Sequence, residues 1–131
     1  SNREFAEKFK QRVKEFVIRA TNLYRALPAT GEAKIFGNQF LRASTSVGSN
    51  YWAACRARSS EEFFSKMSQV TEEADESCFW MEIIISTNVL PKNRVQPLLD
   101  EGYEILAIVA TARKNTPSKT NKKYSPKPPT Q

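Results

Sequence analysis

The stretch RASTSVGSN, residues 42–50, lies in the middle of a strongly periodic helical segment, yet nearly all of its side chains are small. Gly, Thr, Ser and Asn have a lower helix propensity than Ala or Leu, so this stretch is a weak helix by itself. We expect tertiary packing to compensate, because a helix face without bulky side chains lets another backbone come close. The predicted packing or oligomer seam consists of Ala43, Ser44, Val47, Gly48 and Asn50, together with Tyr51, Trp52 and Trp80.

On both sides of this stretch, apolar residues recur at every third or fourth position, which is typical of amphipathic helices. The predicted helices cover residues 3–27, 32–58, 60–88 and 93–114. Ser59 fits an N-cap with Glu62 completing a capping box, and Gln96 occupies the equivalent position in the last helix. Four helices with short connections and no strand pattern predict an all-α fold, an antiparallel up-down-up-down four-helix bundle over residues 1–114.

Length and composition set limits on the class of protein. A chain of 131 residues is long enough for one core, and no apolar run approaches the roughly 18 residues that a membrane span needs. Cys55 and Cys78 are too few for a disulfide framework, and the absence of histidine removes the commonest metal ligand and general base. With no visible signal peptide, the sequence predicts a cytoplasmic protein without a metal or other cofactor.

The net charge of +6 is unevenly distributed along the chain. Residues 1–112 sum to zero, with basic residues concentrated before position 60 and acidic residues between positions 61 and 90. Residues 113–131 carry six Lys or Arg residues and no acid. The segment 115–131 has four prolines and few residues to bury, so we predict a basic C-terminal arm that does not fold alone.

One interpretation of this charge pattern is nucleic-acid binding, because lysine and arginine contact phosphates without reading sequence. The predicted nucleic-acid-binding residues are Arg42, Arg56, Arg58, Lys114, Lys119, Lys122, Lys123 and Lys127. Two alternatives stay open. The arm could simply be a solvated terminus, and the arginines could pair with the acids of residues 72–76, within a subunit or across an oligomer. Arg42 is the strongest candidate for such an internal pair.

The aromatic residues near the small-residue stretch also have two interpretations. Tyr51, Trp52 and Trp80 could stack on bases, but packing in the core or at an oligomer interface is the favoured interpretation. Trp52 lies off the main apolar stripe, where a monomer would expose it. We therefore predict that Trp52 is buried between subunits.

Four motifs together resemble a known family. RASTSVGSN is followed by RSSEEFFSKM (58–67), EEADES (72–77) and Phe79-Trp80. This series resembles the four-helix-bundle family of bacterial 23S rRNA intervening-sequence proteins, which is similar to the accessory variability proteins of diversity-generating retroelements. Where that family usually has one or two acids, this chain has the uncharged residues 51–53. The resemblance implies a homopentameric ring with a nucleic-acid-binding role and no established catalysis.

The residues do not favour an enzyme. Ser44, Ser46 and Ser49 have no histidine to activate them, and the acidic residues lack the Glu-x-x-His motif of di-metal bundles. We therefore expect a non-enzymatic oligomer, a pentamer as the resemblance implies, that binds RNA, DNA or a nucleic-acid-handling protein. It is expected to have no small-molecule substrate and no membrane partner. The alternative is a protein–protein scaffold with no direct nucleic-acid binding.

Overall fold

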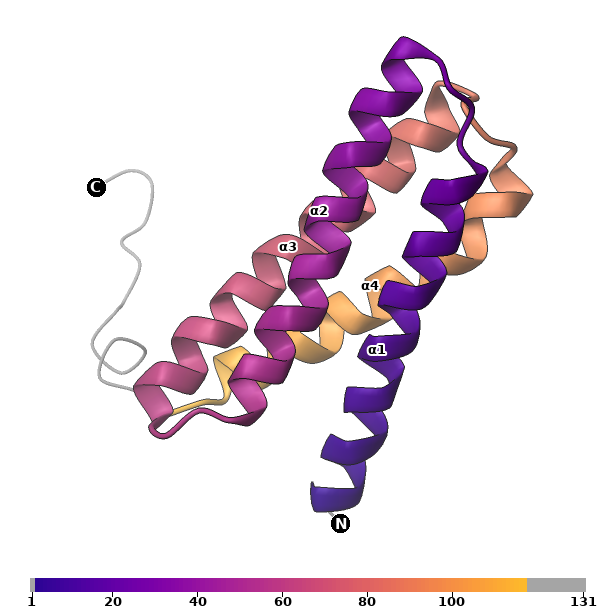
Figure 1. The fold of residues 1–131 in the computed structure, drawn as a ribbon. Helices are drawn as coiled ribbons and strands as arrows, with labels where there is room; N and C mark the ends of the chain where they lie inside the picture. The colour runs from indigo at the N-terminus through magenta and orange to yellow at the C-terminus, as the bar shows by residue number, and fades with distance from the viewer. Residues whose placement is uncertain (1, 118–131) are drawn as a thin grey trace, which may run out of the picture.

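The computed structural model describes residues 2–117, and this part of the chain folds as four α-helices without a strand. The helices are α1 (Asn2–Ala26), α2 (Gly31–Cys55), α3 (Ser60–Ser86) and α4 (Lys92–Lys114). Each helix packs against its neighbour in the chain, and α1 closes the bundle against α4. Figure 1 shows α2 and α3 side by side, whereas α1 diverges from the other helices toward its N-terminus. The predicted all-α class and four-helix bundle are confirmed.

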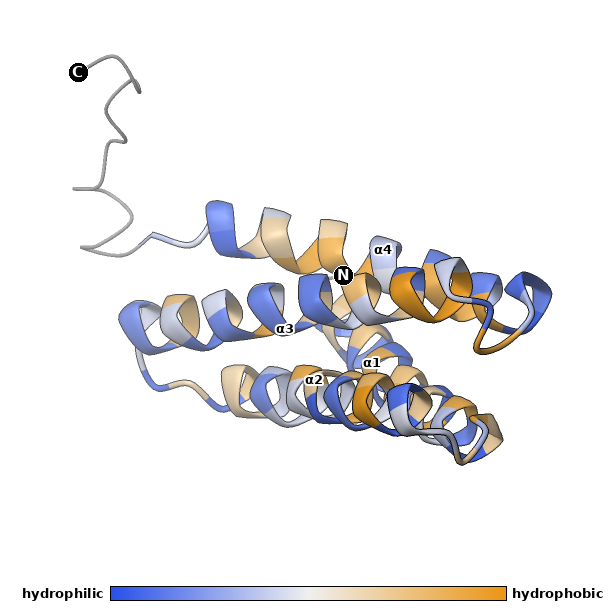
Figure 2. Cartoon of the chain, turned by 90° about the horizontal axis from the view of Figure 1, so that it is seen from above, coloured by the Kyte–Doolittle hydropathy of each residue, from blue (hydrophilic) through white to orange (hydrophobic). Residues whose placement is uncertain are grey.

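The apolar stripes of the four helices meet in one core. Figure 2 shows hydrophobic residues concentrated on the sides of the helices that face one another. The largest fully buried side chains include Phe16 of α1, Phe40 of α2, Met67 and Met81 of α3 and Ile105 of α4. All four helices therefore contribute to the same core, which is what the sequence periodicity predicts.

Two predicted helix ends are wrong by two or three residues. α2 ends at Cys55 instead of residue 58, because the N–H of the C-cap residue Arg56 turns back to the carbonyls of Ala53 and Ala54. Four residues, 56–59, separate α2 from α3, and the last of them, Ser59, is the N-cap of α3 with an extended backbone. α3 ends at Ser86 instead of residue 88, since Asn88 adopts a left-handed φ of 58°. The positively charged connection after α2 is therefore a turn rather than a continuation of the helix.

The predicted caps differ in their outcome. The Ser59 hydroxyl accepts a hydrogen bond from the Glu62 N–H at 3.0 Å, as an N-cap does. The Glu62 carboxylate, however, accepts from the N–H of Arg58 at 3.0 Å, one residue before the position that a capping box requires. The predicted cap at Gln96 is wrong, because its amide donates to Asp100 and α4 begins without a side-chain cap.

None of the described helices is long and apolar enough to cross a lipid bilayer.

Candidate nucleic-acid interface

The small-residue stretch of α2 packs against both of its neighbouring helices. On the α1 side, Gly48 is buried, and a Cβ added there would lie 2.7 Å from Val17 Cγ2. On the α3 side, the buried Ser44 Oγ donates to Ser77 Oγ at 3.2 Å, and Ser77 in turn donates to the Glu73 carbonyl. The small side chains thus allow close packing within a single chain.

The other residues of the predicted seam fall into two groups. Ala43, Val47 and Tyr51 are buried in the core of this chain. Three are only half-buried, namely Asn50, Trp52 and Trp80. The half-buried positions are those that remain accessible to another molecule.

Beside Gly48, an open groove runs between α1 and α2. Its volume is about 430 Å³, and its walls are mostly apolar. The lining residues are Lys14, Val17, Ile18, Thr45, Gly48, Ser49 and Trp52. At this point the groove is lined by Gly48 together with Val17, whose Cγ2 packs against the glycine. The groove therefore combines the positive charge of Lys14 with a mostly apolar surface.

Trp52 is flanked by two cations from different elements. Lys10 Nζ of α1 lies 4.1 Å from the centroid of the Trp52 ring, and Arg56 Cζ lies 5.9 Å from it. This is the geometry of a cation–π interaction, which is worth about 0.5–1 kcal/mol at an exposed site. Within residues 2–117, neither Lys10 nor Arg56 has a carboxylate oxygen within 4 Å. Their charges are therefore available to an anion.

Further cations lie at the same end of the molecule. Figure 1 shows the α2–α3 connection and the end of α4 close together, and the start of α1 points toward the same end but diverges from them. Arg58 is almost fully exposed, with its guanidinium only loosely paired to Glu62 at 3.9 Å. Lys114 is the last residue of α4. We define the basic end as Lys10, Lys14, Arg56, Arg58 and Lys114.

The last turn of α4 is fixed to α3. Arg113 Nε donates to Ser68 Oγ at 2.6 Å, and its guanidinium lies 4.6 Å from the centroid of the Phe64 ring. The arm predicted from the sequence therefore begins at a defined position at the basic end. Four of its predicted phosphate-binding residues lie outside the described residues, namely Lys119, Lys122, Lys123 and Lys127.

Arg42 has a different environment from the basic end. Its guanidinium donates to Glu73 Oε2 at 2.9 Å and also to Glu76. The hydrogen bond to Glu76 raises the pKa of Arg42, and the same bond holds the pKa of Glu76 below its usual value. Trp80 Nε1 donates to the Glu76 carboxylate as well, at 3.0 Å. The internal pairing that the sequence left open for Arg42 is present, so its charge is offset by α3.

Trp80 itself belongs to an aromatic cluster on the α2–α3 face. Its ring stacks on Phe36 with centroids 5.9 Å apart, and Phe79 meets it edge-on at 4.9 Å. Phe79 is 52% exposed. In residues 2–117 no cation lies over these rings, and the nearby Arg42 is paired with Glu73 and Glu76, so this face differs from the surroundings of Trp52.

Sequence reasoning missed Lys10 and Lys14. The sequence alone does not identify them as neighbours of Trp52, because they occur on α1, about 40 residues earlier. That segment has lysines and arginines on several faces. The spacing of four residues between them places them on one face of the helix, which is the only sequence signal available. Their position against Trp52 arises from the packing of α1 on α2.

Comparisons with known proteins agree with this architecture. The sequence model of a family described as 23S rRNA-intervening sequence protein matches residues 7–111. A crystal structure of a protein of unknown function from the S23 ribosomal protein family of Bacteroides thetaiotaomicron is similar, with a TM-score of 0.75 and 28% identity. That match covers 81% of this chain and 98% of the other. No curated protein matches the sequence.

Proposed function

Because this chain belongs to the family of 23S rRNA-intervening sequence proteins, we propose that it is a non-enzymatic oligomer that binds RNA or DNA through its basic end. Membership of the family explains the four-helix bundle and the small-residue stretch of α2, residues 42–50. The binding surface is argued from the residues that this chain itself places there. The two free cysteines, Cys55 and Cys78, fit the reducing cytoplasm in which such a protein would act.

The observation that carries the proposal is the position of Trp52 between Lys10 and Arg56. Single-stranded nucleic acid is bound by aromatic rings that stack on bases and by cations that contact the backbone. Trp52 is half-buried at the rim of the α1–α2 groove, with Lys14 along the same groove. This combination supplies both kinds of contact within one surface.

In this proposal, the C-terminal arm, residues 115–131, extends the basic end. It follows Lys114 and carries four lysines spaced among prolines, serines and threonines. Such a segment gains affinity through phosphate contacts and counterion release rather than by reading bases. No base-reading module is recognisable in the chain, so the binding is expected to depend on charge and on single-stranded regions more than on sequence.

The experiment is a binding titration over a salt series of about 50 to 300 mM, because counterion release makes log K fall linearly with log salt. A structured RNA with single-stranded loops and a DNA of the same sequence serve as probes. The triple variant Lys10→Gln, Lys14→Gln, Arg56→Gln should lower the slope by about two for single strands. Loss of residues 118–131 should lower it further.

A matched control carries the same loss of charge at the opposite end of the bundle. Arg25, Lys34 and Lys92 are exposed and lie outside the basic end. Replacing all three by Gln should leave the slope within experimental error of the original protein. If both triple variants lower affinity equally, binding follows net charge alone and the basic end is not the interface.

The proposal includes assembly into a homopentamer, as the family resemblance implies. In this assembly the Trp52 ring stays accessible to the nucleic acid, and its burial by the neighbouring copy would exclude the stacking contact. Light scattering coupled to size-exclusion chromatography measures the mass directly, and a mass of five chains is the expected result. A monomer at the concentrations used for binding would remove this part of the proposal.

The second candidate is a protein–protein scaffold that binds no nucleic acid. The exposed Phe79 and the neighbouring Trp80 favour it, because an exposed aromatic cluster whose nearby arginine is already paired suits a protein partner. The same titration separates the two functions. A scaffold would show no binding to either probe at low salt, whatever its oligomeric state.

A further inference from the structure

A second basic site lies at the opposite end of the bundle, between α1 and α4. It is a pocket of about 250 Å³. The residues that line it are Arg19, Asn22, Leu23, Ala26, Arg94, Pro97 and Leu98. The lining contains two arginines and no carboxylate. None of these residues belongs to the basic end, so this pocket is independent of the proposed interface.

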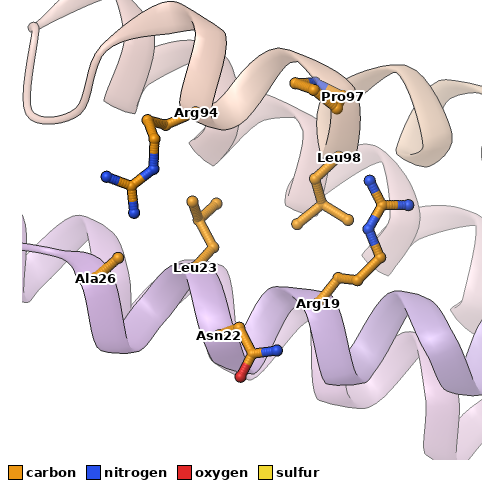
Figure 3. A pocket seen from close by; sticks show the side chains of 7 residues that line it. All are labelled: Arg19, Asn22, Leu23, Ala26, Arg94, Pro97 and Leu98. Atoms are coloured by element: carbon orange, nitrogen blue, oxygen red, sulfur yellow. The ribbon is translucent and has the colours of Figure 1, made fainter.

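Figure 3 shows how the two arginines are arranged. The Arg94 side chain extends from α4 toward α1, and the Arg19 side chain extends from α1 toward α4. Leu23 and Leu98 lie between the two guanidinium groups. Both leucines are more than nine-tenths buried, so they form a firm apolar floor. Two cations therefore border one small pocket from opposite helices.

Neither arginine is neutralised by the protein. Among residues 2–117, no carboxylate oxygen lies within 4 Å of Arg19 or Arg94. The contrast with Arg12 is informative, because Arg12 joins the same two helices. Arg12 Nε lies 2.7 Å from Glu101 and its Nη2 lies 3.0 Å from Glu104. The α1–α4 interface thus satisfies one arginine with acids of α4 and leaves two without any.

The start of α4 adds to the positive potential. Its N-cap is Pro91, which makes no side-chain cap, and its first turn contains no acid. Instead, the first turn carries Lys92 and Arg94, although the N-terminal end of a helix is itself partly positive. In the free protein, the cations at this position are repelled by the partial positive charge of the helix N-terminus. A bound anion would be attracted by both and would offset this repulsion.

We propose that the α1–α4 pocket is a phosphate-binding site in which Arg19 and Arg94 hold the phosphate oxygens. The planar guanidinium group donates two parallel hydrogen bonds to a phosphate, which favours phosphate over a spherical anion. The apolar floor receives the uncharged part of the ligand, and the volume admits a phosphate with a small attached group. The phosphate is either free or a phosphomonoester, or it belongs to a nucleic-acid backbone.

The test follows the Nε–Hε signals of the arginines by NMR in the full chain. Sodium phosphate is titrated against sodium chloride at equal ionic strength, which separates binding from screening. The signals of Arg19 and Arg94 should shift saturably with phosphate and stay nearly still with chloride. Arg19→Gln and Arg94→Gln should each weaken phosphate binding about threefold to tenfold, since both guanidiniums are partly solvated. In the double variant, the backbone amide signals of Leu23 and Leu98, which line the pocket, should no longer respond to phosphate.

Arg25→Gln is the matched control, because it removes one arginine at the same end of α1 without altering the pocket lining. It should leave the phosphate response unchanged, and thermal melting should show that all variants fold. An equal loss of response in Arg25→Gln would overturn the site, as would shifts of the same size with chloride.

A second arm of the experiment identifies the source of the phosphate. A short single-stranded RNA without a terminal phosphate is added to the original protein and to the double variant. Shifts of the Arg19 and Arg94 signals in the original protein, together with weaker RNA binding by the double variant, would assign the site to backbone phosphates. A response to inorganic phosphate but not to this RNA would assign it to free phosphate or a phosphomonoester. Absence of both responses overturns the proposal, whatever happens at the basic end.

Discussion

Gly48 of α2 and Val17 of α1 lie so close that a Cβ on residue 48 would be only 2.7 Å from Val17 Cγ2. The branched Cγ2 cannot rotate away freely, because a β-branched residue in a helix has one strongly preferred rotamer. The α1–α2 contact is therefore built around the missing side chain. The glycine lowers the intrinsic stability of α2 but allows the two helices to pack closely.

Replacing Gly48 should consequently destabilise the protein. We expect Gly48→Ala to lower the free energy of unfolding by about 1–2 kcal/mol, since the strain of overpacking exceeds the gain in helix propensity. Gly48→Leu should prevent normal folding or assembly. Urea denaturation followed by circular dichroism measures the effect.

Gly31→Ala is the control for the Gly48 variants. A Cβ at Gly31, the first residue of α2, would meet no atom within 4 Å. This change should be neutral or should stabilise the protein by up to about 1 kcal/mol, because it restricts the unfolded chain. Val17→Ala in the Gly48→Ala background should recover part of the loss. Full stability of Gly48→Leu would contradict the close contact.

The ion pairs of Arg42 predict a dependence of stability on pH. Arg42 and Trp80 lower the pKa of Glu76, so the ionised carboxylate contributes stability above its unfolded pKa, near 4.5. That contribution is lost as the pH falls through the folded pKa. After allowance for partial exposure, Arg42→Gln should therefore cost about 1 kcal/mol at pH 7, and progressively less as the pH falls from 4.5 through the folded pKa of Glu76. Urea denaturation over this pH range measures it.

The same variant separates a structural role of Arg42 from a binding role. Because Arg42 is already paired with Glu73 and Glu76, Arg42→Gln should leave nucleic-acid affinity unchanged at moderate salt. Arg58→Gln is the comparison, since the ion pair that Arg58 makes within residues 2–117 is loose and exposed. It should affect stability by less than about 0.5 kcal/mol. A large drop in affinity for Arg42→Gln alone would restore Arg42 to the interface.

The sequence is sufficient to predict the helices and their buried faces, but not the contacts that form the surface sites. The spacing of Phe16, Phe40 and Met67 in their apolar stripes predicts which face is buried, because a helix repeats every 3.6 residues. The end of α2 could not be predicted, because the last helical turn depends on competing hydrogen bonds by Arg56. Lys10 could not be assigned to Trp52, since their contact arises only when α1 packs on α2.

The two cysteines should differ sharply in reactivity. Burial raises the pKa of Cys78 to about 12, whereas Cys55 is exposed near the end of α2. At pH 8 the thiolate fraction of Cys78 is then on the order of 10⁻⁴, and the thiolate is the reactive form. Gly102 also packs against its Sγ, where an added Cβ would lie 2.9 Å away. A thiol-specific reagent should therefore modify one cysteine per folded chain and two in denaturant.

Cys55→Ser provides the control for this experiment. The variant should show almost no reaction while folded, and one reactive thiol per chain after denaturation. Rapid modification of Cys78 in the folded variant would mean that the contact between α3 and α4 opens readily.

The final prediction concerns the fluorescence of Trp52. The chain has two tryptophans, so Trp80→Phe leaves Trp52 as the only one. If bases stack on Trp52, adding RNA at low salt should quench its emission, and Trp52→Ala should weaken binding about fivefold to tenfold, the lower range for loss of one stacking contact. In the Trp52→Phe variant, Trp80 is the remaining tryptophan, and its response to RNA serves as the control. Its emission should not respond, because Trp80 packs on Phe36 and bonds to Glu76 away from the basic end. The Trp52 emission could instead shift to shorter wavelength with rising protein concentration and not respond to RNA. In that case an interface between copies buries Trp52, and the stacking role is excluded.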